Sequence, residues 1–141
     1  MLHVMFNVDC IPIGKQRPRF RRTGKFVQTY TPKKTVEFEA LIRKAAEKAM
    51  GGMEPLETPV ALYCYVRLPV PKSYPKKRLE ACLSGFEAPT KKPDIDNSIK
   101  VVQDALNGVI YKDDAQIVSL HATKKYDMNP GVEILVKEEL P

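Results

Sequence analysis

The feature that most constrains the fold is the order in which apolar residues repeat along the chain. Four segments alternate apolar and polar residues with the period of two that a half-buried β-strand requires. They are residues 2–9, 60–68, 116–126 and 131–137. One stretch with helical spacing of apolar residues lies between the first two segments, and another precedes the third. This order predicts an α+β fold, a mixed sheet of about four strands covered by two main helices.

The predicted helices have recognisable ends. The first main helix begins at Thr31-Pro32, a capping hydroxyl followed by a proline suited to the first helical position, and it ends at Gly51-Gly52. The second runs from Asn97 to Gly108. A short helix ending at Gly85 is expected within the basic, proline-rich connection that precedes the second main helix.

Length and composition fit a single globular domain. A chain of 141 residues can bury one hydrophobic core but not two substantial ones, so we expect one domain spanning residues 1–141. No apolar run approaches the roughly 20 residues of a membrane span, and the N-terminus lacks the features of a secretory signal. Three widely spaced cysteines argue against a disulfide framework or a zinc site. We therefore expect a cytoplasmic protein without a membrane partner.

The excess positive charge lies near the N-terminus. The net charge is +6, yet no acid occurs between Asp9 and Glu37, and the chain outside this window has a net charge of −2. Within this window, residues 19–30 are typical of a hairpin or an extended arm that turns at Thr23-Gly24. Nucleic acid is the natural partner of such a patch, because each neutralised phosphate releases condensed counterions. A solvated basic surface is the alternative.

The candidates for contact with DNA phosphates follow from this patch and from a lysine pair before the second main helix. They are Lys15, Arg17, Arg19, Arg21, Arg22, Lys25, Lys91 and Lys92. Two aromatic residues lie among the arginines, Phe20 and Phe26. Aromatic residues in strands usually pack in a core, and the alternative is that one of them lies against exposed DNA bases.

Aspartates gather in the stretch KKPDIDNSIKVVQDALNGVIYKDDAQI, residues 91 to 117. Five of the seven aspartates lie there, and none of the ten glutamates falls between residues 94 and 114. On a helix, positions 96, 100, 103 and 107 share one narrow sector opposite the apolar stripe. Asp94 lies just before this helix, so its carboxylate and that of Asp96 are expected to converge at the helix N-terminus.

Two explanations of these acids are open. Asp96 can be an N-cap, Lys100 an ion-pair partner of Asp96 and Asp104, and the pair at 113 and 114 a turn. Alternatively, residues 109–111 return as a strand and bring this pair back to the helix start. Carboxylates gathered in this way repel one another unless a cation compensates, and oxygen ligands without histidine or thiolate favour Mg²⁺ or Mn²⁺. Such an ion beside DNA can generate a nucleophilic hydroxide from water and stabilise a phosphoryl displacement.

The motifs KPDIDN, Lys100 and DALNGVIYKDDAQI together resemble the RusA family of Holliday junction resolvases, found in bacteria and their prophages. The segments GKQRPRF and YTPKKT are similar to the basic lead-in of many members, so the resemblance covers most of the chain. It implies a Mg²⁺-dependent endonuclease that works as a homodimer and makes paired nicks in opposing strands of a four-way DNA junction.

The resemblance also implies which residues act. Asp94, Asp96 and Asp114 match the catalytic, metal-holding carboxylates of the family, and Lys100 matches its functional lysine. Asn97, Asp104 and Asp113 match motif positions of less certain role. Ser98 stands where a larger apolar residue is expected, which predicts looser packing of the helix. Residues 72–92 are longer than the corresponding link in the smallest members, and their role is not implied.

Two other functions fit parts of the sequence. A non-catalytic nucleic-acid binding protein would use the aspartates only in caps and turns, and it would bind junctions without Mg²⁺-dependent nicking. An Asp-x-Asp pair also occurs in the metal and nucleotide site of sugar transferases, although one small domain leaves little room for a donor-binding fold. Turnover of a nucleotide sugar would identify that activity.

Overall fold

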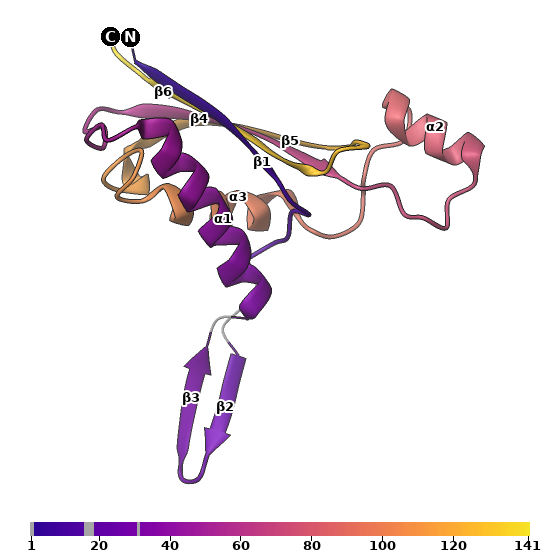
Figure 1. Cartoon of the computed structure of the whole chain (residues 1–141), viewed down its shortest axis with the longest axis horizontal. Coiled ribbons are helices and arrows are strands. Elements are labelled where there is room, and N and C mark those ends of the chain that lie inside the picture. Colours follow the sequence, from indigo (N-terminus) through magenta and orange to yellow (C-terminus); the bar gives the residue numbers. More distant parts are fainter. Residues whose placement is uncertain (1, 16–18, 31) are drawn as a thin grey trace.

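A mixed four-stranded sheet forms the centre of the molecule (Figure 1). The computed structural model describes residues 2–15, 19–30 and 32–141, and it describes only the backbone at residues 19 and 28–30. The strands of the sheet are β1 (His3–Asp9), β4 (Val60–Leu68), β5 (Ile117–Tyr126) and β6 (Gly131–Glu138). Their order is β1-β6-β4-β5, antiparallel except for the parallel pair β4–β5. The α+β class and the four predicted strands are confirmed.

Both main helices lie on one side of this sheet (Figure 1). They are α1 (Lys33–Met50) and α3 (Ile95–Leu106). α1 ends at Gly51, whose positive φ of 56° suits glycine, and its N–H bonds to the carbonyl of Glu47 at 3.2 Å. The buried faces of the helices and the facing strand residues form one core, which includes Phe38, Ile42, Ile99, Val102, Leu106, Leu62, Val66 and Ile134. Among the residues described, no helix is long and apolar enough to cross a membrane.

The opposite side of the sheet carries no helix in Figure 1. Met5 on β1 and Tyr65 on β4 are exposed there, 61% and 48% respectively. On the same side, the ring of Tyr63 stacks on that of His121 with centroids 4.8 Å apart. The sheet therefore buries one face, which explains the alternation of apolar and polar residues in the sequence.

A β-hairpin projects away from the sheet and helices (Figure 1). It consists of β2 (Arg19–Thr23) and β3 (Phe26–Tyr30), joined by the two-residue turn Gly24-Lys25. Gly24 has a φ of 62°, as the first central position of a type II′ turn requires. Phe20 and Phe26 are exposed, so the interpretation of these side chains as core residues is wrong. The hairpin predicted from the sequence is present, and the exposed rings of Phe20 and Phe26 do not pack in the core.

Residues 109–111 do not form the strand that was expected to return the chain to α3. Instead they make a buried turn, in which Leu56 N–H bonds to the Ile110 carbonyl at 2.8 Å and Gly108 N–H bonds to the Tyr111 carbonyl at 2.7 Å. Residues 109–111 have apolar or aromatic side chains because the turn is buried in the core, and not because the backbone forms a strand. The expected strand is therefore wrong.

Tyr111 joins this turn to the end of α3. Its ring is fully buried, and its hydroxyl donates to the carbonyl of Gln103 at 2.9 Å. The N–H of Asn107 bonds to Asp104 instead of Gln103, so the tyrosine supplies a donor that the helix end lacks. Burial raises the pKa of Tyr111 well above its ordinary value, and the nearby Asp114 carboxylate raises it further. The turn thus fixes where the chain goes after α3.

All three cysteines are free thiols, as their spacing predicted. Burial raises the pKa of Cys10 to about 11 and that of Cys64 to about 12. Both thiols therefore stay protonated near neutral pH, which makes them poor nucleophiles and poor metal ligands.

Candidate active site

Asp94 and Asp96 lie at the first turn of α3. Asp94 occupies the N-cap position with an extended backbone, yet its side chain makes no capping hydrogen bond, and Asp96 lies within the first turn. Both residues are exposed. The helix begins two residues earlier than Asn97, so the interpretation of Asp96 as an N-cap is wrong. Neither carboxylate is occupied by capping, and both lie at the positive end of the helix dipole.

A chain of ion pairs crosses the exposed side of α3. Asp104 is its centre, because Oδ2 lies 3.1 Å from Lys15 Nζ and Oδ1 lies 3.3 Å from Lys100 Nζ. The Lys100 ammonium also lies 3.9 Å from Asp114 Oδ2. The Asp104 side chain is only 22% exposed, so solvent screens these pairs less than a pair on the open surface. Lys100 is therefore held between Asp104 of α3 and Asp114, which follows the helix.

The segment before the hairpin packs directly on α3. Lys15 N–H bonds to the Asn97 carbonyl at 2.9 Å, and Ser98 Oγ donates to the Ile13 carbonyl at 2.9 Å. A Cβ on Gly14 would lie 3.0 Å from the Asn97 Cβ, so only glycine allows this approach without a shift. Residues 13–15 are thereby fixed against the first turn of α3, which carries Asp96.

Ser98 was expected to loosen the packing of this helix, and it does not. The side chain is buried, 1% exposed, and its hydroxyl satisfies a carbonyl of the segment that crosses it. A larger apolar residue would bury more area, but it would leave the Ile13 carbonyl without this donor. Here a polar residue in a buried position attaches one segment to another.

The acid pair after α3 has two different roles. Asp113 caps η1 (Asp114–Gln116): its side chain accepts from the Ala115 N–H at 3.3 Å, while Gln116 accepts from the Asp113 N–H at 3.0 Å. Asp113 is thus a capping residue of η1, and it does not lie in a turn between two strands as the alternative reading expected. Asp114 is not used in this way and turns toward Lys100.

Gln116 is a positioning residue that the sequence reading missed. Its side-chain amide donates to the carbonyls of Leu56 and Thr58, both at 2.9 Å, and so attaches η1 to the segment before β4. The spacing of Asp113 and Gln116 is that of a capping box, which is the signal that could have revealed it. This anchoring determines where Asp114 lies.

The other predicted DNA-binding residues lie on the hairpin and directly before α3. Arg22 and Lys25 are exposed on the hairpin, Arg21 lies between Phe20 and Arg22 on β2, and Lys91 and Lys92 are exposed just before Pro93. Arg17 and the side chain of Arg19 are outside the described residues. Lys15 differs from the others, because its ammonium binds Asp104 within the site.

The residue types fit a hard divalent cation, since aspartate oxygens are the ligands that Mg²⁺ and Mn²⁺ prefer. Within residues 2–15, 19–30 and 32–141, however, no three acidic, histidine or cysteine side chains are close enough together to hold an ion. Asp114 approaches Lys100 in this structure. Direct sharing of one ion by Asp94, Asp96 and Asp114 would require their side chains to move.

We expect the substitution Ser98→Ala to lower the free energy of unfolding by about 1–2 kcal/mol, because the Ile13 carbonyl loses its donor. Chemical denaturation measures this change. The control is Ser84→Ala, which removes a hydroxyl bonded to the Ala81 carbonyl on the exposed side of a helix and should change stability by less than about 0.5 kcal/mol. Equal effects of the two substitutions would contradict the role of Ser98.

Comparisons with known proteins identify the family of the chain. The family model described as "Endodeoxyribonuclease RusA" matches residues 9–137, which include every candidate catalytic residue. A protein of Bacillus subtilis (strain 168), named "Uncharacterized protein YqaN", is 39% identical over 139 residues, 96% of each chain. The match spans the hairpin, α3 and the acid pair that follows it. The chain therefore belongs to the RusA family of endodeoxyribonucleases.

Proposed function

We propose that the protein is a metal-dependent, structure-selective DNA endonuclease that resolves four-way junctions by paired nicks. One observation supports this most: two exposed aspartates without capping duties lie at the start of α3, and a lysine on the same helix contacts a third aspartate. Membership of the RusA family supports hydrolysis of DNA. A sugar transferase has no support in this comparison.

In this proposal Asp94, Asp96 and Asp114 hold Mg²⁺, or Mn²⁺ in its place. The bound ion would supply an activated water and offset the negative charge that develops during displacement at phosphorus. Asp94 and Asp96 present their carboxylates from one rigid helix end, which limits the conformational freedom lost when they bind an ion. Asp114 is positioned by the η1 turn that Asp113 and Gln116 maintain.

Lys100 is proposed to place its positive charge beside the scissile phosphate or the leaving oxygen. Asp104 restrains it at 3.3 Å, so the ammonium does not have to be ordered when DNA arrives. When Asp114 turns toward a cation, Lys100 loses one of its two acidic partners and becomes available to phosphate. This exchange links cation binding to substrate binding.

The partner is proposed to be four-way junction DNA, bound through the basic hairpin and the lysines before α3. A homodimer suits such a substrate, because a two-fold symmetric junction presents two equivalent phosphates to two equivalent sites. A cytoplasmic role in DNA recombination and repair follows from this substrate. The alternative, a DNA-binding protein without catalysis, predicts the same affinity and no nicking.

We expect Asp96→Asn to abolish Mg²⁺-dependent nicking of a synthetic four-way junction and to leave junction affinity unchanged or improved. The amide removes a charged metal ligand, and it also removes a charge that repels phosphate. Nicks are mapped on all four strands with and without Mg²⁺.

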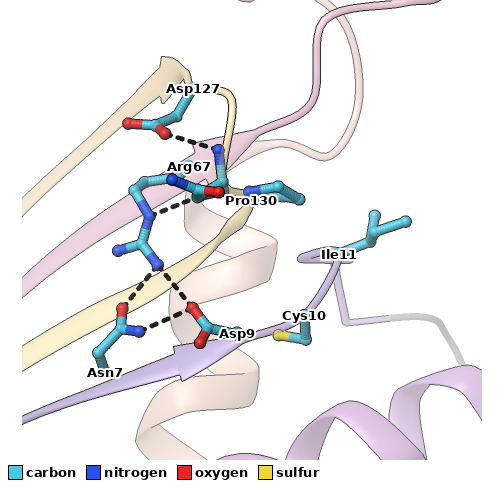
Figure 2. A pocket seen from close by; sticks show the side chains of 8 residues that line it. Asn7, Asp9, Cys10, Ile11, Arg67, Asp127 and Pro130 are labelled. Carbon is cyan, nitrogen blue, oxygen red and sulfur yellow. Dashed lines mark hydrogen bonds and ion pairs between the residues drawn. The ribbon is translucent and has the colours of Figure 1, made fainter.

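The matched control for this substitution is Asp9→Asn, which removes the same charge from an exposed aspartate at the end of β1, paired with Arg67 at 3.7 Å (Figure 2). It should nick like the parent. If Asp96→Asn nicked the junction as fast as the parent, Asp96 would not be needed for the reaction and the proposed site would be wrong. Absence of nicking by the parent itself, with tight junction binding, would favour the non-catalytic alternative.

We expect Arg22→Ala and Lys25→Ala on the hairpin to weaken junction binding across all sequences. Each lost phosphate contact should reduce the slope of log affinity against log salt by roughly 0.9. Binding is measured by fluorescence anisotropy over a range of salt concentrations, and Lys44→Ala on the exposed side of α1 is the control. An unchanged slope in both hairpin variants would show that the hairpin does not contact phosphate.

A further inference from the structure

Residues 69–92, here called the α2 arm, project from the end of the sheet that is nearest the start of α3 (Figure 1). The arm contains α2 (Lys76–Ser84) and connects β4 to α3. It carries a net charge of +4, from two glutamates and six basic residues: Lys72, Lys76, Lys77, Arg78, Lys91 and Lys92. Neither the resemblance nor the proposed site gives this arm a role.

The arm has its own fixed structure. The Arg78 guanidinium lies 3.7 Å from the centroid of the Tyr74 ring, and its Nε bonds to both carboxylate oxygens of Glu87, at 3.0 and 3.2 Å. The end of α2 is closed by bonds from Gly85 N–H to the Cys82 carbonyl at 3.3 Å and from Glu87 N–H to the Ala81 carbonyl at 3.1 Å. The backbone on both sides of residue 86 is therefore held in place.

Phe86 lies between these fixed residues and is 92% exposed. Leu83, one turn earlier, is also exposed. A single exposed apolar residue is ordinary on a protein surface. Here, however, backbone hydrogen bonds fix the residues on both sides of the aromatic ring, and no described residue covers the ring. The ring offers a flat apolar face to a partner without having to be ordered first.

The arm is attached close to the candidate active site. Lys91 and Lys92 precede Pro93 and Asp94 directly, and Lys124 Nζ donates to the carbonyls of Lys91 at 3.0 Å and Pro93 at 3.1 Å. Lys15, on the segment that precedes the hairpin in the sequence, also bonds to Asn97 of α3. The arm therefore joins the chain directly before the first turn of α3, where this segment also packs.

We infer that the α2 arm is a second DNA-binding element, in which Phe86 stacks on an unpaired base while the lysines contact the adjoining phosphates. The inference rests on the proposed function. Aromatic stacking together with a basic surface is how proteins bind unpaired nucleotides, and a branched junction exposes bases where its arms meet. The net charge of +4 on the α2 arm disfavours a second copy of the arm as its binding partner, because two such surfaces repel each other.

The test uses Phe86→Trp in the full chain, which contains no native tryptophan. The indole emission should be strongly quenched by a four-way junction with unpaired bases at its centre and little changed by a blunt duplex of the same length. Met5→Trp, on the exposed side of the sheet, is the control and should respond to neither DNA. Phe86→Ala should bind the junction about tenfold more weakly and the duplex unchanged.

Three outcomes would overturn the inference. Equal quenching by junction and duplex would mean that the ring does not read unpaired bases. If both Phe86 variants bind and nick the junction like the parent, and the emission of Phe86→Trp does not change on binding, the proposed function stands and the arm has no part in it. Emission that responds to protein concentration but not to DNA would assign the arm to self-association. If the parent does not bind DNA at all, the proposed function fails first.

Discussion

The carboxylate of Asp104 is the interaction on which the arrangement of the site depends. It binds Lys15 with one oxygen and Lys100 with the other, and through Lys100 it reaches Asp114. The segment around Lys15 and the segment around Asp114 are thereby held to one face of α3. Without this carboxylate, Lys15 and Lys100 would lose a common partner that is largely shielded from solvent.

The fold explains why such a face exists. The other side of α3 is packed in the core, with Val101, Val102, Ala105 and Leu106 fully buried against α1 and the sheet. The helix cannot rotate without exposing this apolar surface, so the opposite side presents its charged residues in a fixed order. The basic α2 arm joins the chain directly before the first turn of this helix.

The sequence predicted what depends on periodicity and local chemistry. The four strands, the hairpin turn at Gly24 and the glycine ends of α1 and α2 follow from residue types within a few positions. Prediction from the sequence failed where a contact with a distant segment determines the local structure. Residues 109–111 have strand-like side chains but pack as a turn against Leu56, and Ser98 is polar because Ile13 crosses it. Gln116 was missed because its bonds go to a segment about 60 residues away.

We propose that Asp94, Asp96 and Asp114 bind one divalent ion. Titrating ¹⁵N-labelled protein with Mn²⁺ and recording which amide resonances broaden would test it most directly. The amides of residues 94–97 and 113–115 should broaden together at the same Mn²⁺ concentration, and Asp114→Asn should raise the concentration needed for both. Broadening confined to one of these segments, or found first at another acidic pair such as Glu138 and Glu139, would contradict the account.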